Sequence, residues 1–159
     1  MHIAEGYLPL LHCVGWGIVS GAHVMAGTRA AAPWRVPTAT QPREPVSALG
    51  TALLGPRRMA PVAMGILLLQ ALLLAHGGLT TLGANAWSLG VVCPWVTWGV
   101  WTLLRRFSLA DGLALGIATA LGDLATYAAT AGQLALAQQA NGVALVDAWI
   151  SILGVFAVT

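Results

Sequence analysis

The first two residues, Met1 and His2, carry the donor atoms best suited to chemistry in this chain. The α-amine of Met1, the deprotonated amide nitrogen of His2 and the His2 imidazole can close fused chelate rings around one metal ion. Nitrogen donors of this kind suit Ni(II), Cu(II) or Co(II). Because these three nitrogens leave one planar position open, a complete site needs a further nitrogen from elsewhere in the chain. The alternative is that the histidine at position two is accidental and binds nothing.

Three further histidines lie in different sequence environments. His76 opens a glycine-rich stretch that ends at Asn85, whose amide could orient a ligand. The alternative for His76 is an interfacial histidine that caps a helix end. His12 and His23 lie about three turns apart in an apolar run, where an ionisable group is costly unless it faces a partner or a cavity. For each of these two we expect neutral, hydrogen-bonded packing.

Asp123 is the acidic candidate. It lies about fifteen residues into a long apolar segment, which places it roughly 22 Å from the inner end of a helix and nearer the outer face. A carboxyl at this depth is either functional or held by a structural hydrogen bond to a neighbouring helix. We expect Cys13 and Cys93, which have no CxxC or histidine spacing, to be small buried packing residues.

The composition requires a membrane environment. Hydrophobic residues make up 58% of the 159 residues and charged residues 8%, too few to cover the surface of a water-soluble domain. All seven cationic residues are arginines in a few polar stretches, which argues against nucleic-acid binding. The chain has no serine hydrolase elbow, zincin motif or P-loop, so any ATP must be hydrolysed by a partner.

The elements that must position these residues are apolar helices. We predict an all-α, polytopic transmembrane bundle of about 4–6 membrane segments, forming a single membrane domain over residues 1–159. In that bundle Gly112, Gly116 and Ala120 have the spacing that lets another helix approach closely. The start of the chain lacks the basic region of a signal peptide, so we expect Met1 to be the mature end. The predicted spans are 7–27, 59–75, 86–104, 109–138 and a partial 148–159, with a polar linker at 28–45 and a short apolar piece at 46–54.

The arginines predict the topology, because cationic loops stay on the cytoplasmic side of a membrane. They fall between the first two predicted spans and directly after the third. Alternation then brings Met1, the 76–85 loop and the 138–147 loop together on the outer face of the membrane.

Three stretches together resemble one family: Met1–Pro9 (MHIAEGYLP), Leu68–Asn85 (LLQALLLAHGGLTTLGAN) and Gly122–Tyr127 (GDLATY). The family is the membrane-embedded substrate-capture subunit (S component) of cobalt and nickel energy-coupling factor (ECF) ABC transporters, of the cobalamin-biosynthesis type. The resemblance continues through Phe156–Thr159.

The resemblance implies a function, partners and a location. Such subunits bind a divalent metal from outside through the amino-terminal Met and His and one further histidine. They dock on a transmembrane coupling subunit and ATPase subunits, with a small accessory membrane subunit as a further candidate partner. We therefore expect a non-enzymatic transporter subunit in the inner (cytoplasmic) membrane, in contact with lipid and with no nucleic acid. Its cargo would be Co(II) or Ni(II), between which these donors do not choose, and no cofactor is expected.

The chain departs from the family at the third histidine, because the matching position is Arg43. The family's second helix is replaced by the polar linker, and its last helix is not completed. We predict that His76 substitutes for the missing donor, in a metal site made with Met1 and His2, with Asn85 and Asp123 as supporting or structural candidates. The alternative function is a degenerate or partial copy that forms a bundle without transport. An intramembrane enzyme using Ser20 with His23 or Asp123 has no recognisable nucleophile–base motif.

Overall fold

The computed structural model is a bundle of helices and describes residues 3–4, 6–31, 50–51, 54–74, 77–139 and 141–158. Within these ranges there is no β-strand, which confirms the predicted all-α class. The elements are, in order, α1 (Leu10–Ala31), α3 (Pro56–Leu73), α4 (Leu82–Ala86), the π-helix η1 (Trp87–Val92), α5 (Cys93–Arg106), α6 (Asp111–Gln139) and α7 (Leu145–Val158).

Three stretches of the described helices are long and apolar enough to cross a membrane: Leu10–Arg29, Leu82–Arg106 and Asp111–Gln139. Helix α3 has 18 residues but carries Arg57, Arg58 and Gln70, and it does not belong to this group. The apolar helix α7 is shorter, with 14 residues. The molecule is therefore a multi-pass membrane protein in which two helices are less suited to crossing alone.

The linker predicted from residue 28 begins later than expected, because α1 continues to Ala31. Thr28 donates its hydroxyl to the carbonyl oxygen of Met25 at 2.9 Å, within the helix. The residues up to Ala31 are compatible with a helix, and the first proline that interrupts one is Pro33. Residues 32–49, which hold Arg43 and the first four residues of the short apolar piece, lie outside the described part of the chain, as do residues 52–53.

Helices α4, η1 and α5 form one continuous path from Leu82 to Arg106. A proline explains why its central part is a π-helix. Pro94 has no N–H to bond to the carbonyl of Gly90, and its ring would clash with that carbonyl in a regular helix. The wider π turn accommodates this clash, and the same Gly90 packs against Ala60 and Ala63 of α3.

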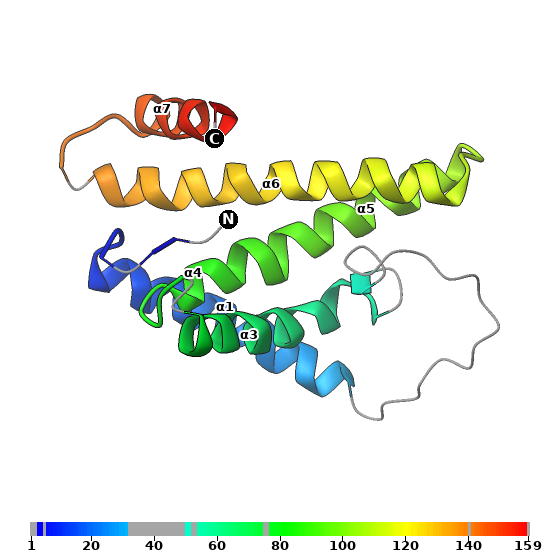
Figure 1. The fold of residues 1–159 in the computed structure, drawn as a ribbon, viewed down its shortest axis with the longest axis horizontal. Helices are drawn as coiled ribbons and strands as arrows, with labels where there is room; N and C mark the ends of the chain where they lie inside the picture. Colours follow the sequence, from blue (N-terminus) through cyan, green and yellow to red (C-terminus); the bar gives the residue numbers. More distant parts are fainter. Residues whose placement is uncertain are drawn as a thin grey trace.

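The helices run lengthwise in the bundle (Figure 1), with α5 and α7 packed on α6 and with α1 and α3 packed on each other and on α4 and η1. One end of the bundle holds the amino-terminal segment, the start of α4 and the last turn of α6. We call it the amino-terminal end. The opposite end, which we call the arginine end, holds the start of α3 and the turn between α5 and α6. The arginine pattern predicted this grouping of loops, and the side of the membrane on which each end lies stays a prediction.

The small residues predicted to let another helix approach α6 are the wrong ones. Gly112, Gly116 and Ala120 are exposed, and a Cβ added to either glycine would meet nothing within 4 Å. The close approach is made two residues after Ala120, because a Cβ at Gly122 would collide with the side chain of Thr97 on α5. This buried stripe consists of Ala114, Ala118, Gly122, Thr126 and Thr130.

Candidate functional site

The amino-terminal segment is held by its main chain at Ile3. The N–H of Ile3 donates to Oδ1 of Asn85 at 2.7 Å, and Nδ2 of Asn85 donates to the carbonyl oxygen of Ile3 at 3.1 Å. The hydroxyl of Thr81 donates to the same carbonyl at 2.7 Å. Ile3, Thr81 and Asn85 are all buried. Because these polar groups have left water, each would be costly to leave unpaired, and the position of Ile3 is therefore sharply defined.

The helix that carries Asn85 is fixed against α1 by an unusually close approach. A Cβ on Gly83 would collide with the backbone of Gly17 and lie 2.9 Å from the carbonyl carbon of Trp16. The hydroxyl of Ser20 on α1 donates to the carbonyl oxygen of Gly83. Glycine is needed here because no side chain fits between the two backbones. This crossing brings the first turn of α4 to the amino-terminal segment.

A buried polar network ties the same region to α6. Nε2 of Gln133 donates to the carbonyl oxygen of Ala84 at 3.1 Å, next to Asn85 in sequence. The hydroxyl of Ser88 lies 3.1 Å from Oε1 of Gln133, and the hydroxyl of Thr130 donates to Ser88 at 3.3 Å. Gln133, Ser88 and Thr130 are each no more than 2% exposed. The network thus joins α4 to α6, in addition to the contact that joins α4 to α1.

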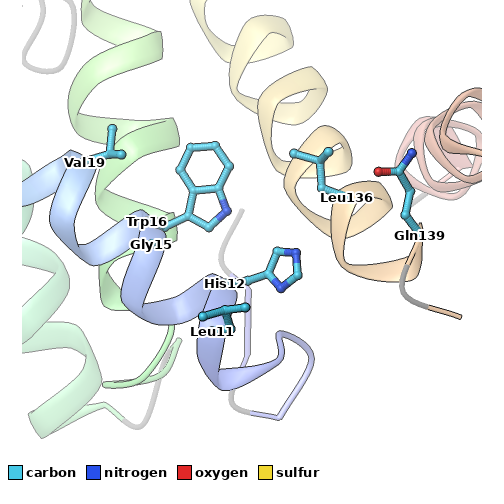
Figure 2. A pocket seen from close by; sticks show the side chains of 7 residues that line it. All are labelled: Leu11, His12, Gly15, Trp16, Val19, Leu136 and Gln139. Carbon is cyan, nitrogen blue, oxygen red and sulfur yellow. The ribbon is translucent and has the colours of Figure 1, made fainter.

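A cavity of about 400 Å³ lies between α1 and α6 at this end of the bundle. His12 projects from α1 toward α6 in Figure 2, with Leu136 across from it. Its Nδ1 is buried and has no hydrogen-bond partner within the described residues. Neutral, hydrogen-bonded packing was the expectation for His12, and the described part of the chain supplies no hydrogen bond to Nδ1 that would support it. The lining residues are Leu11, His12, Gly15, Trp16, Val19, Leu136 and Gln139.

His23 is bound in the way that was expected for a histidine in a membrane helix. Its Nδ1 lies 3.0 Å from the carbonyl oxygen of Val19, one turn earlier, and its ring packs edge-on against Trp87 with centroids 5.1 Å apart. It lines a different cavity, which also involves Arg57 and Trp95. The hydroxyl of Ser20 donates to the carbonyl oxygen of Gly83 and Nδ1 of His23 donates to that of Val19, so the two form no nucleophile–base pair.

The structure describes only some of the remaining residues that the sequence predicted for the site. Met1, His2 and His76 lie outside the described residues. Asp123 is exposed near the middle of the 29-residue helix α6, rather than near the outer end as expected. Neither a hydrogen bond nor an ion pair joins Asp123 to any other described residue. Cys13 is buried, as expected, and Cys93 is half-buried.

Within the described ranges, no three histidine, cysteine, aspartate or glutamate side chains gather as a metal site would require. The metal site of Met1, His2 and His76 therefore stays a prediction, because all three residues lie outside the described ranges. What the described residues provide is the fixed backbone at Ile3 and the open cavity between α1 and α6. Sequence reasoning missed Thr81, Ser88, Gln133 and Gly83, and the only signal for them was the presence of polar residues and glycine in apolar segments.

The fold and this end of the bundle define a helical membrane protein whose amino-terminal segment is anchored through the main chain of the buried Ile3. The family model for the cobalt uptake substrate-specific transmembrane region, CbiM, matches residues 45–159. The chain belongs to this family of transport proteins, which confirms the family resemblance seen in the sequence.

Curated relatives match all or most of the chain. The chain is 37% identical to the cobalt transport protein CbiM of Kyrpidia tusciae, in an alignment that covers 100% of this chain and 75% of that protein. It is 38% identical to the cobalt transport protein CbiM of Streptomyces coelicolor, covering 86% of this chain and 70% of that protein. The first alignment runs over 185 positions while this chain has 159 residues, so the relative carries segments that this chain lacks.

Two crystal structures share the fold. One, described as a truncated transition metal transporter, has a TM-score of 0.79 and 24% identity and covers 96% of this chain. The other, described as a transition metal transporter, has a TM-score of 0.76 and 23% identity and covers 99% of this chain. They support the helical arrangement described above.

Proposed function

We propose that this protein captures divalent cobalt or nickel at the outer membrane face, as the substrate-specific subunit of an ATP-driven energy-coupling factor transporter. The family to which the chain belongs supports cobalt uptake as the general activity. The observation that carries the finer proposal is the pairing of Asn85 and Thr81 with the main chain of Ile3. A bundle that buries and fixes the third residue limits where the first two can go.

The proposed binding step uses the chain's own amino terminus. Met1 offers its α-amine and His2 its amide and imidazole nitrogens, which suit Ni(II) and Co(II). Asn85 acts in this proposal as the supporting residue, because it holds the main chain that follows the chelate. Outer-shell partners of this kind orient metal ligands and affect metal affinity. Transport itself is assigned to a transmembrane coupling subunit and ATPase subunits that dock on this chain.

A partial or degenerate copy that forms a bundle without transport is the second candidate. Two observations favour it: Arg43 stands at the position of the family's third histidine, and the alignment with the K. tusciae relative is longer than this chain. The two candidates differ in a measurable property, which is metal binding by the amino terminus.

The decisive experiment measures nickel and cobalt binding to the purified protein in detergent. One variant carries a single extra residue before Met1, which moves the amine out of the chelate. The matched control carries one extra residue after Thr159. We expect binding by the native chain and by the control, and loss of at least about tenfold in affinity for the amino-terminal extension. No binding by any of the three would favour the degenerate copy.

The orientation can be tested separately. The proposal places Met1 and the 77–85 loop outside and the arginine end inside, as the positive-inside rule requires. A cysteine introduced at exposed Leu79 should react with a membrane-impermeant thiol reagent in intact cells, whereas one at exposed Phe107 should react only after the cells are lysed. The opposite pattern would place the binding end in the cytoplasm and contradict capture from outside.

A further inference from the structure

We propose that the cavity between α1, α3 and α5, beside the start of α3, binds the phosphate group of an anionic phospholipid. The cavity has a volume of about 360 Å³, and Arg57 and Trp95 help to line it. Both residues are exposed, so a molecule in the surrounding membrane can reach them. This site uses none of the predicted metal ligands and is therefore independent of the proposed function.

The wall of the cavity is cationic and contains no acidic side chain. Arg57 is its charged residue, and the rest of the lining is small or apolar apart from His23 and Trp95. Among the described residues the ion pair is that of Arg105 and Asp111, and Arg57 takes no part in it. A guanidinium presents a fork of N–H donors that matches two oxygens of a phosphate. Arg57 is therefore available to an anion.

The start of α3 also favours a negative group at this place. The helix begins with Pro56, Arg57 and Arg58, has no acidic residue in its first turn and has no side-chain cap. Because the first turn of a helix carries a partial positive charge, cations there are unfavourable unless an anion is near. A phosphate bound by Arg57 would supply that negative charge.

The cavity lies at the level of lipid headgroups. The membrane-spanning stretch of α1, Leu10–Arg29, has 20 residues, which corresponds to about 30 Å and to the thickness of the hydrocarbon core. A Cβ on Gly27, in the last turn of that stretch, would collide with the carbonyl oxygen of Arg57. Arg57 is thus placed where α1 leaves the hydrocarbon, which is where the phosphates of the bilayer begin.

Trp95 and His23 contribute differently to the cavity. Trp95 is 44% exposed, and its indole N–H can donate to a phosphate or glycerol oxygen. Tryptophan is also enriched where the hydrocarbon meets the headgroups. His23 already uses Nδ1 for the carbonyl oxygen of Val19 and packs edge-on against Trp87. We therefore assign binding to Arg57, with Trp95 as the second donor.

The test measures lipid binding to the full-length protein by native mass spectrometry after purification in detergent. Phosphatidylglycerol and phosphatidylcholine with the same acyl chains are titrated separately, because both carry a phosphodiester but choline balances its charge. We expect the native chain to bind phosphatidylglycerol at least about fivefold more tightly than phosphatidylcholine. Arg57→Gln should lower the affinity for phosphatidylglycerol about tenfold, which is the effect of one charge-assisted hydrogen bond.

Two further variants separate the cavity from general charge. Arg106→Gln removes an exposed arginine that does not line the cavity, so the affinity should change by less than about twofold. Ala26→Phe fills the cavity and leaves Arg57 in place, so it should weaken binding about as much as Arg57→Gln. All three substituted residues are exposed, so the variants should fold, and size-exclusion chromatography checks that they do.

The proposal fails if the native chain binds both lipids equally, or if Arg57→Gln and Arg106→Gln lose equal affinity, because net charge alone would then attract the lipid. Native affinity in Ala26→Phe would show that the lipid binds outside the cavity. Displacement of phosphatidylglycerol by an equimolar amount of inorganic phosphate would identify free phosphate as the ligand in place of a lipid. None of these results depends on nickel binding by the amino terminus, so a failure here leaves the proposed function unaffected.

Discussion

At the amino-terminal end of the bundle, Ile3, Thr81 and Asn85 are joined by hydrogen bonds between buried groups. At the arginine end, Arg105 and Asp111 form an ion pair with Nε and Oδ1 3.3 Å apart, and both side chains are more than half exposed. Arg105 also lies over the ring of Trp101, 5.1 Å from its centroid. The two ends use polar groups in opposite surroundings.

The difference shows where this bundle requires a unique structure. A buried polar group that loses its partner cannot turn to water, so the amino-terminal end tolerates one arrangement only. Exposed charges exchange their partners for water at little cost, so the arginine end is free to vary in detail. We expect its arginines to bear mainly on the orientation of the chain in the membrane.

The largest effect is expected from Gly83→Leu at the amino-terminal end. The new side chain has no space against the backbone of Gly17, so the crossing of α1 and α4 must open. We expect a loss of about 3 kcal/mol or more in the free energy of unfolding, measured by thermal unfolding in detergent. Gly99→Leu on α5 is the control, because a Cβ there meets nothing within 4 Å, and it should be neutral. Equal stability of the two variants would refute the close crossing.

Asn85→Ala should have a smaller effect on stability and a clear one on metal binding. It removes the hydrogen bonds to the main chain of Ile3, which costs about 1–3 kcal/mol for buried groups left unpaired. If the anchored main chain positions the chelate, nickel affinity should fall by about 10- to 100-fold in an equilibrium titration. Ser88→Ala is the control, since Ser88 is equally buried but does not touch Ile3. A similar loss of affinity in both would mean that general destabilisation is the cause.

The smallest effect is expected at the arginine end. Replacing Arg105 or Asp111 by alanine should change the free energy of unfolding by less than about 0.5 kcal/mol, because the pair is exposed. A double-mutant cycle at low and high salt measures the coupling, which should decrease as salt is added. A coupling above about 2 kcal/mol would show that the two ends are not as different as the burial indicates.

The sequence predicts the elements well because their signals are local. Apolar runs, prolines and arginine pairs mark where helices start and end, and the helix Asp111–Gln139 falls almost where the apolar segment predicts it. The packed face of α6 could not be predicted. Gly112 and Gly116 have the same four-residue spacing as Ala114 and Ala118, and spacing alone does not say which stripe meets a neighbour.

The site was predictable only in part for the same reason. Met1 and His2 are recognisable as a chelate from covalent structure, which requires no fold. The hydrogen bonds of Asn85 and the surroundings of His12 depend on which groups the fold brings beside them. The burial of Nδ1 of His12, which has no hydrogen-bond partner among the described residues, depends on how the helices pack and has no signal in the sequence.

The pairing between Asn85 and Ile3 also restricts how the amino-terminal segment can vary. An asparagine amide presents an acceptor oxygen and a donor NH2 group, and here each of them bonds to the main chain of Ile3. Because both hydrogen bonds are made to the main chain, the contact depends on which position lies opposite Asn85 and not on the side chain at that position. Other aliphatic residues at position 3 should therefore be tolerated. Proline there is excluded because it has no N–H. An inserted or deleted residue before position 3 would leave the contact intact and would change the number of residues that precede it. The number of residues before this contact is therefore constrained far more than their composition.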